Sequence, residues 1–268
     1  MDEMESIMRC IEMGAADYLP KPFNPLLLQA RINASLATKW LHDQEEISRQ
    51  RIEEYNRVLE GRVQEQLQQL QESFAKLRKT LDGTVLALSS ALERRDPYTA
   101  GHQQRVAQLA CAIAKEIGLP EDRIEGLRVA GILHDIGKIS VPFDILSKPG
   151  RIIKEEFNII KIHSQVGYDI LKSIEFPWEV AKFVLQHHES FDGSGYPAGL
   201  ARENISLEAR ILKVADVVEA MASHRPYRAS LGISKALEEI LEKRGLHFDP
   251  AIVDACIIVF QEKGFAFD

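Results

Sequence analysis

The 268-residue sequence contains few cysteines and no long apolar run, and each shortage excludes a class of protein. The three cysteines, Cys10, Cys111 and Cys256, lie far apart without a C-x-x-C pair, so we expect reduced thiols rather than a disulfide framework. Apolar runs such as residues 257–260 fall far short of the ~20 residues that a membrane span requires. The start of the chain is acidic and lacks the apolar core of a secretory signal. We therefore expect a cytoplasmic protein that makes no contact with a membrane.

An excess of positive charge is also missing. The chain has 33 Lys and Arg residues against 40 Asp and Glu residues, a formal net charge of −7. An acidic protein gains little from attraction to a phosphate backbone, so we expect no nucleic-acid polymer as a partner. Apolar residues make up 45% and charged residues 27% of the chain, which is ordinary globular composition and excludes a wholly disordered protein. A small anionic substrate remains compatible where basic groups gather locally.

The first 39 residues are predicted to form a helix, a short extended segment and a second helix. The helical run from Met4 to Met13 ends at Gly14, a typical helix C-terminus. Residues 17–19 are expected to be extended, and Pro25 suits the first turn of the next helix. A lone strand leaves an unpaired edge, so this segment is expected to dock on a partner, to dimerise or to be loosely ordered.

Residues 40–92 contain no proline and are predicted to form a coiled-coil helix. Roughly 50 helical residues would extend about 75 Å, and such a helix has no core of its own to cover its apolar stripe. We therefore predict a parallel homodimer; the alternative is that the stripe packs back on its own domain. Gly61 is expected to weaken the helix by about 1 kcal/mol. The predicted seam follows a 4-3-4-3 spacing through Val63, Leu67, Leu70, Phe74, Leu77, Leu81, Thr84, Leu88 and Ala91.

Residues 93–268 show helical periodicity and no alternating strand pattern, which predicts an all-α bundle. Asp249 and Pro250 fit the start of its last helix. Residues 191–199 hold three glycines and a proline and are therefore predicted to form a loop. The predicted helices cover residues 99–117, 121–133, 154–171, 178–188, 206–222, 234–244 and 250–260.

Histidine and aspartate recur at the ends of these helices and in one apolar run. Neutral imidazole and carboxylate together suit Fe, Mn, Zn or Ni ions, and facing helices are where bundles build such sites. Seven such residues are too many for one tetrahedral ion and suit two adjacent ions, with Asp135 as a bridge. Two divalent ions, two carboxylates and one hydroxide leave about one net positive charge, which attracts a phosphodiester. The candidates are His102, His134, Asp135, His163, His187, His188 and Asp216.

Each of these residues also has an ordinary structural interpretation. A single helical histidine is usually packed or solvated, and a His-Asp dipeptide occurs by chance. Lys138 could be a solvated lysine at a helix end, and the glycine loop could be only a turn. The joint pattern is more specific than its parts. His42, His224 and His247 are interpreted as structural or surface histidines.

The motifs from about Glu93 to the last helix resemble those of the HD-GYP family of bacterial phosphodiesterases, a subgroup of the HD superfamily. The resemblance implies metal-dependent hydrolysis of cyclic di-GMP to linear pGpG, and leaves open whether the reaction continues to GMP. It implies that the nucleophile is a hydroxide bridging the ions, because metal ions lower the pKa of water toward 7. The matching segments are residues 95–102, 134–138, 148–150, 187–189, 195–197, 214–216 and 225–228.

The resemblance also assigns roles to residues. The seven histidines and aspartates named above would be the metal ligands, with Asp135 and Lys138 as the catalytic residues. Two ions are implied rather than three, because Tyr98 stands where members with a third ion carry glutamate. Iron or manganese is expected, with nickel or zinc as alternatives. The residues that would contact the substrate are Lys138, Tyr196, Arg225 and Arg228.

Residues 4–39 resemble the C-terminal part of a response-regulator receiver domain, most closely over residues 14–23. Lys21 would match the phosphate-sensing lysine, and Lys21-Pro22 is a candidate cis peptide. The segments that carry the phosphorylated aspartate and the acidic pair are absent, so phosphorylation by the receiver mechanism is not expected. The implied organisation is a partial receiver over 1–39, which would be a small α/β remnant, a coiled-coil linker over 40–92 and an all-α HD-GYP domain over 93–268.

Two other functions remain open from the sequence. The same residues would serve a hydrolase of another cyclic dinucleotide or of a nucleotide. A non-catalytic signalling adaptor would use the ions structurally and relay a state through the coiled coil. Signalling partners such as a diguanylate cyclase are compatible with all of these functions.

Overall fold

A computed structural model describes residues 3–19, 21–94, 101–148, 150–223 and 230–267 of the chain. Within these ranges every regular element is a helix, with no strand and only two isolated bridges, Asp192 with Ala201 and Arg244 with Phe248. The chain divides into two compact units, Met1–Lys76 and Leu77–Asp268. The all-helical prediction for the C-terminal part is therefore confirmed.

The first unit contains α1 (Glu3–Glu12) and the greater part of α2 (Pro25–Glu93). Residues 17–19 form no strand in the described backbone, so the expected α/β character of this segment is not seen. The physical reason is that a strand needs a second strand to pair with, and the elements on either side of residues 17–19 are both helices. The predicted cis bond between Lys21 and Pro22 is confirmed.

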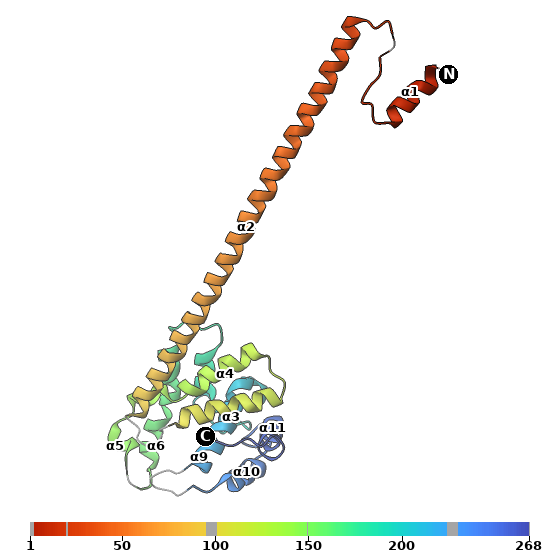
Figure 1. Cartoon of the computed structure of the whole chain (residues 1–268). Helices are drawn as coiled ribbons and strands as arrows, with labels where there is room; N and C mark the ends of the chain where they lie inside the picture. Colours follow the sequence, from red (N-terminus) through yellow and green to blue (C-terminus); the bar gives the residue numbers. More distant parts are fainter. Residues whose placement is uncertain (1–2, 20, 95–100, 149, 224–229, 268) are drawn as a thin grey trace. The chain divides into compact units, whose positions relative to one another are not determined.

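The long helix α2 runs from Pro25 to Glu93 without a break, so the helix predicted after Pro25 and the helix predicted over 40–92 are continuous (Figure 1). It passes through Gly61 without a break, since the energetic penalty of one glycine is small beside the many backbone hydrogen bonds of the helix. The seam side chains Leu67, Leu70 and Phe74 are more than half exposed. In the last turns, Val85 and Leu92 are instead buried in the second unit.

The helices predicted for the second unit are present in the structure, with two differences in their number and bounds. The predicted helix over 154–171 is divided at Ile162, and three short helices appear that the periodicity did not reveal. The short helices are η1 (Ile136–Ser140), α5 (Phe143–Leu146) and η2 (Arg202–Asn204). The longer ones are α3 (His102–Glu116), α4 (Glu121–Leu133), α6 (Lys154–Lys161), α7 (His163–Leu171), α8 (Val180–Gln186), α9 (Leu207–Ala222), α10 (Ile233–Glu242) and α11 (Pro250–Gln261).

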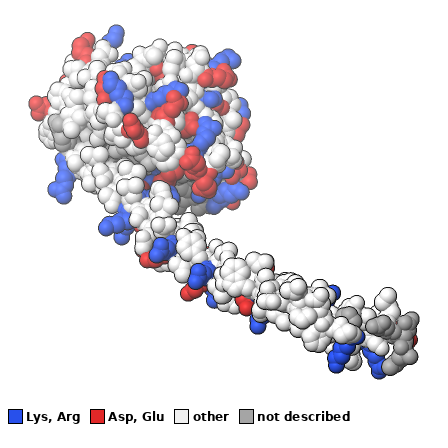
Figure 2. Space-filling model, turned by 90° about the horizontal axis from the view of Figure 1, so that it is seen from above, with Lys and Arg blue, Asp and Glu red and all other residues white. Residues whose placement is uncertain are grey.

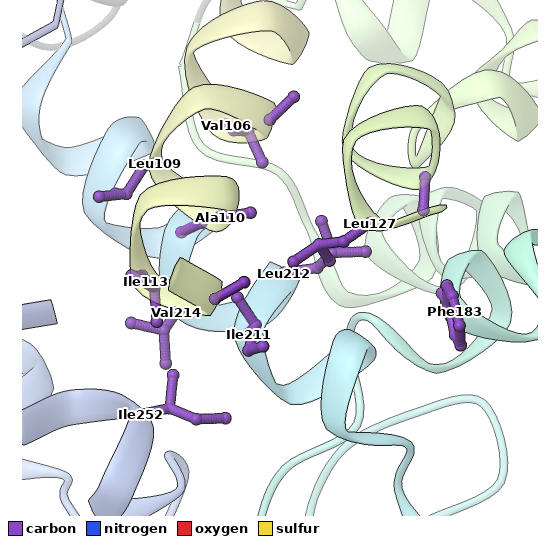
Figure 3. Close-up of a cluster of buried hydrophobic side chains, with 14 of the residues drawn as sticks. Val106, Leu109, Ala110, Ile113, Leu127, Phe183, Ile211, Leu212, Val214 and Ile252 are labelled. Atoms are coloured by element: carbon purple, nitrogen blue, oxygen red, sulfur yellow. The ribbon is translucent and has the colours of Figure 1, made fainter. Parts of the chain in front are cut away.

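The core of the second unit lies between α3, α4, α8, α9 and α11 (Figure 3). Helices α3 and α4 approach closely because Gly131 faces Ala107, where an added Cβ would lie 2.8 Å from the Ala107 Cα atom. Each large aliphatic side chain removed from water here contributes about 1.5–3 kcal/mol to the free energy of unfolding. The central side chains are Val106, Leu109, Ala110, Ile113, Leu127, Phe183, Ile211, Leu212, Val214 and Ile252.

Charged side chains of both signs lie on the surface. Lys and Arg side chains alternate with Asp and Glu side chains over the face shown in Figure 2. None of the helices in the described ranges is both long enough and apolar enough to cross a membrane.

Candidate metal centre

The seven predicted ligand residues come from five segments of the second unit and meet in one place. His102 and His163 are the first residues of α3 and α7, and His187 and His188 directly follow α8. His134 and Asp135 join α4 to η1, and Asp216 lies within α9. Six of the seven therefore sit at or just beyond the end of a helix. The side chains of His102, His134, Asp135, His163 and His187 are at most 3% exposed, whereas His188 and Asp216 are half-buried.

The donor atoms form three overlapping groups, in each of which all atoms lie within 4.8 Å of one another. The first group is His163, His187 and His188, and the second is His102, His134 and Asp216. The third is His134, Asp135 and His187, which links the other two. Each of the three groups could therefore hold a metal ion.

Asp135 lies between the two outer groups. Its Oδ1 atom is 3.6 Å from Nε2 of His163, and its Oδ2 atom is 3.4 Å from Nε2 of His134. Oδ2 is also 4.0 Å from Nε2 of His102. Because the two oxygens face different groups, this carboxylate lies between the His163 group and the His102–His134 group.

The backbone fixes the tautomer of three of the histidines. Nδ1 of His134 donates to the Gly131 carbonyl at 2.7 Å, and Nδ1 of His163 donates to the Ile160 carbonyl at 2.6 Å. Nδ1 of His187 donates to the Val184 carbonyl at 2.5 Å. A carbonyl oxygen only accepts, so Nδ1 carries the proton and Nε2 keeps a free lone pair.

The Nε2 atom of His134 is buried and makes no hydrogen bond to any described residue. A buried lone pair without a partner lowers the stability of the fold unless an ion or a proton donor binds to it. Ligating histidines characteristically donate their other ring nitrogen to a carbonyl or a carboxylate, as these do. The residues present therefore fit a metal ion.

His102 is held by a carboxylate that the sequence analysis missed. Its Nδ1 atom is hydrogen-bonded to Oε2 of Glu219, which is only 1% exposed. Oε1 of Glu219 accepts from Arg105 Nε at 2.7 Å and from Ser223 Oγ at 2.7 Å. The signal available in the sequence was the spacing, because Glu219 follows Asp216 by three residues and shares its helix face.

Sequence comparison relates this chain to known proteins. The sequence profile of the HD domain family matches residues 87–252. The chain belongs to the HD domain family. The cyclic di-GMP phosphodiesterase response regulator RpfG of Xanthomonas campestris is 38% identical over 249 residues, covering 92% of this chain. The chain spans only 62% of the length of that relative.

Two further comparisons concern the whole chain and the fold. A cyclic di-GMP phosphodiesterase of Thermotoga maritima is 34% identical over 263 residues, covering 97% of this chain and 70% of its own length. The crystal structure of the cyclic GMP-AMP specific phosphodiesterase V-cGAP3 of Vibrio cholerae superposes with a TM-score of 0.53 at 20% identity. It covers 67% of this chain and 48% of its own, and at this identity it supports the fold alone.

The two aspartates of the candidate site, Asp135 and Asp216, are held ionised. Burial by itself raises the pKa of Asp135, but the charges of Lys138 and the nearby imidazoles outweigh burial and hold that pKa well below its usual value. The same balance holds for Asp216, where the hydrogen bond and charge of His102 lower the pKa. Burial would lower the pKa of His102, but hydrogen bonds to Asp216 and Glu219 raise it to about 9. A cation at Nε2 of His102 therefore has to displace a proton.

The other imidazoles are held neutral. Burial lowers the pKa of His187 to about 3, and it lowers the pKa of His188 well below 6.5. Burial likewise lowers the pKa of His163. Metal ions bind neutral imidazole, so near neutral pH this part of the donor set is already in its binding form.

The remaining predicted site residues are only partly within the described ranges. Nζ of Lys138 donates to Oδ2 of Asp135 at 2.6 Å, so it contacts the central carboxylate. The Tyr196 ring lies 4.8 Å from the His188 ring, measured between centroids. Tyr98, Arg225, Arg228 and His224 lie outside the residues that the structure describes. His42 is exposed and His247 is half-buried, and neither belongs to the donor groups.

The loop that carries Tyr196 is organised by a second missed residue, Glu189. This carboxylate is 1% exposed and accepts hydrogen bonds from the backbone nitrogens of Ala198 at 2.7 Å and Leu200 at 3.0 Å. Gly195 is required for close approach, because an added Cβ would lie 2.2 Å from the Ser190 nitrogen. The loop is thus folded against the residues that follow His188.

Replacing Gly137 by alanine tests the contact between η1 and α7. An added Cβ would lie 1.9 Å from the His163 carbonyl oxygen and 2.5 Å from the Gly167 nitrogen. We expect the free energy of unfolding to fall by about 1–3 kcal/mol or more, since overpacking against backbone cannot relax by a side-chain movement. Urea denaturation followed by circular dichroism measures the change.

Gly83→Ala is the matched control for this prediction. Gly83 lies in α2 within the second unit and has no atom within 4 Å of an added Cβ. Alanine there should raise the free energy of unfolding by up to about 1 kcal/mol. Equal urea midpoints for the two variants would show that the η1–α7 contact is not as close as described.

Proposed function

We propose that this HD domain is a metal-dependent phosphodiesterase of the HD-GYP type that hydrolyses cyclic di-GMP to linear pGpG, with onward cleavage to GMP as a second stage to be tested. One observation carries the proposal: Asp135 lies between two groups of donor side chains, and three imidazoles have their free lone pairs fixed by backbone carbonyls. The two relatives named cyclic di-GMP phosphodiesterases support the choice of substrate.

We infer that the site holds two divalent ions, iron or manganese in preference to nickel or zinc. One ion would be held by His163, His187 and His188, and the other by His102, His134 and Asp216, with Asp135 between them. When bound, such ions lower the pKa of water and neutralise charge that develops on phosphorus. Imidazole and carboxylate donors suit all four of these metals, so the preference for iron or manganese rests on the family resemblance.

The residues of the chain itself position and neutralise the substrate. Asp135 and Lys138 are the proposed catalytic residues, with the Lys138 ammonium adding fixed positive charge beside the central carboxylate. Tyr196 stands next to His188, where it would contact a bound nucleotide. Arg225 and Arg228 are proposed to bind the substrate on the family resemblance alone.

The proposed organisation follows the sequence boundaries. Residues 1–39 would be the receiver remnant, residues 40–92 the coiled-coil linker and residues 93–268 the catalytic domain of a cytoplasmic signalling protein. Exposed seam residues such as Val63, Leu67 and Phe74 support a homodimer, because a second copy of the helix would cover them. A diguanylate cyclase or another signalling protein is a proposed partner.

A product assay tests the proposed function. Chain purified without oxygen and loaded with Fe(II) or Mn(II) should convert cyclic di-GMP into linear pGpG, detected by chromatography. Chelation should abolish the reaction, and the same metal should restore it. Cyclic di-AMP and 3'3'-cGAMP form the comparison panel. Bound metal without turnover of any of the three would contradict the proposal and favour the adaptor function.

A further inference from the structure

The ammonium group of Lys161 lies against two aromatic rings beside the candidate metal centre. Its Nζ atom is 5.0 Å from the centroid of the Phe157 ring and 5.3 Å from the centroid of the Tyr196 ring. A cation within about 6 Å of a ring centroid is attracted to the ring face. Neither Lys161 nor Phe157 was singled out by the sequence analysis.

Two separate segments create this arrangement. Phe157 and Lys161 are four residues apart in α6 and therefore share one helix face. The Tyr196 ring from the glycine loop meets the Phe157 ring edge to face, with centroids 6.3 Å apart. The Tyr196 ring is also 4.8 Å from the His188 ring and 6.5 Å from the His163 ring. The Tyr196 ring therefore lies between the Lys161 ammonium group and the imidazole of His188.

The charge of Lys161 is not neutralised in the way that the charges of its neighbours are. Lys138 Nζ is 2.6 Å from Asp135 Oδ2, and Lys148 Nζ is 2.6 Å from Glu156 Oε1. No carboxylate in the described ranges forms an ion pair with Lys161. The two rings therefore flank an ammonium group that forms no ion pair with a described carboxylate and that could pair with an anionic ligand.

We propose that Lys161 is a substrate-binding residue for the second phosphate of a cyclic dinucleotide, the phosphate that is not being cleaved. This inference rests on the proposed function. A cyclic dinucleotide carries two phosphodiester groups in one ring, so when one group is at the metal-binding donors the other must lie beside them. An ammonium is a compact point charge that suits phosphate, and the flanking rings limit its movement.

The test compares two substrates on the full-length, metal-loaded chain. Cyclic di-GMP has a second phosphate, whereas bis(p-nitrophenyl) phosphate has only the one that is cleaved. Lys161→Gln should raise the KM for cyclic di-GMP roughly tenfold, the loss typical of one charged hydrogen bond, with kcat changed less than about twofold. The same variant should leave both constants for bis(p-nitrophenyl) phosphate unchanged. Lys161→Arg, which keeps the charge, should retain most of the affinity for cyclic di-GMP.

Lys182→Gln is the matched control, because Lys182 lies on α8 and pairs with Glu179 at 3.0 Å. It should leave the kinetics of both substrates unchanged. Equal losses on both substrates for Lys161→Gln, or no loss on either, would overturn the inference while the proposed function stands. Wild-type chain that cleaves bis(p-nitrophenyl) phosphate but not cyclic di-GMP would overturn the proposed function, and this inference with it.

Discussion

Replacing Asp135 by asparagine is expected to remove hydrolysis of cyclic di-GMP and to lower the metal content of the purified chain. Oδ1 of this residue faces Nε2 of His163, while Oδ2 faces Nε2 of His134 and accepts from Lys138. Asparagine keeps the shape but offers one oxygen and one NH2 group. It therefore cannot present an anionic oxygen to both donor groups.

The loss should be large because the substitution also removes a charge from the centre of the site. The pKa of Asp135 is held well below its usual value by the charges of Lys138 and the nearby imidazoles, so the carboxylate is ionised near neutral pH. Loss of a residue that only supports a ligand typically lowers metal affinity or activity roughly 10–100-fold, and loss of a bridging ligand should exceed that range. Metal analysis and the product assay measure the two effects separately.

Asp122→Asn is the control for this change, since Asp122 is exposed at the start of α4, away from His134 at the other end of that helix. Both variants should keep the helical circular dichroism spectrum of the wild type. An Asp135→Asn chain that retains its ions and its rate would exclude the bridging role.

The helical part of the fold could be predicted because its signals are local. The helix from Glu121 to Leu133 has the predicted bounds, since its periodicity and flanking residues suffice to define it. The bounds of η1 and α5 could not be predicted, because four- and five-residue helices are too short for periodicity. The boundary predicted near residue 40 rests on a change in composition, and the helical backbone of α2 crosses that position without a break.

The residues of the candidate site also differ in whether a local sequence signal reveals them. The ligand residues could be proposed from residue type and motif, and the structure brings those seven side chains together. Residues that act by contact could not be found in this way. Glu189 contacts the backbone of Ala198 and Leu200, and Lys161 meets Tyr196 across 35 positions of sequence, so only the folded chain reveals either role.

Glu219→Gln is expected to weaken metal binding roughly 10–100-fold while leaving the fold intact. The Glu219 carboxylate accepts the proton on Nδ1 of His102, which directs Nε2 toward Asp216 Oδ1 at 3.3 Å. Glutamine keeps one acceptor oxygen, but it loses the charge that makes the imidazole a stronger donor and breaks the link to Arg105. Titration of metal-free chain with Mn(II) should show the loss of affinity, and activity should recover in part at high Mn(II).

The same helix supplies a closely matched control in Glu208. This residue is also buried in α9 and is also held by an arginine, with Arg123 Nη2 2.6 Å from its Oε1 atom, but it touches none of the donor histidines. Glu208→Gln should therefore lower the free energy of unfolding and leave Mn(II) affinity unchanged. If both variants weakened Mn(II) binding equally, the effect of Glu219 would come from a general loosening of α9. If only Glu219→Gln weakens Mn(II) binding, the effect comes from the contact by which the Glu219 carboxylate orients His102.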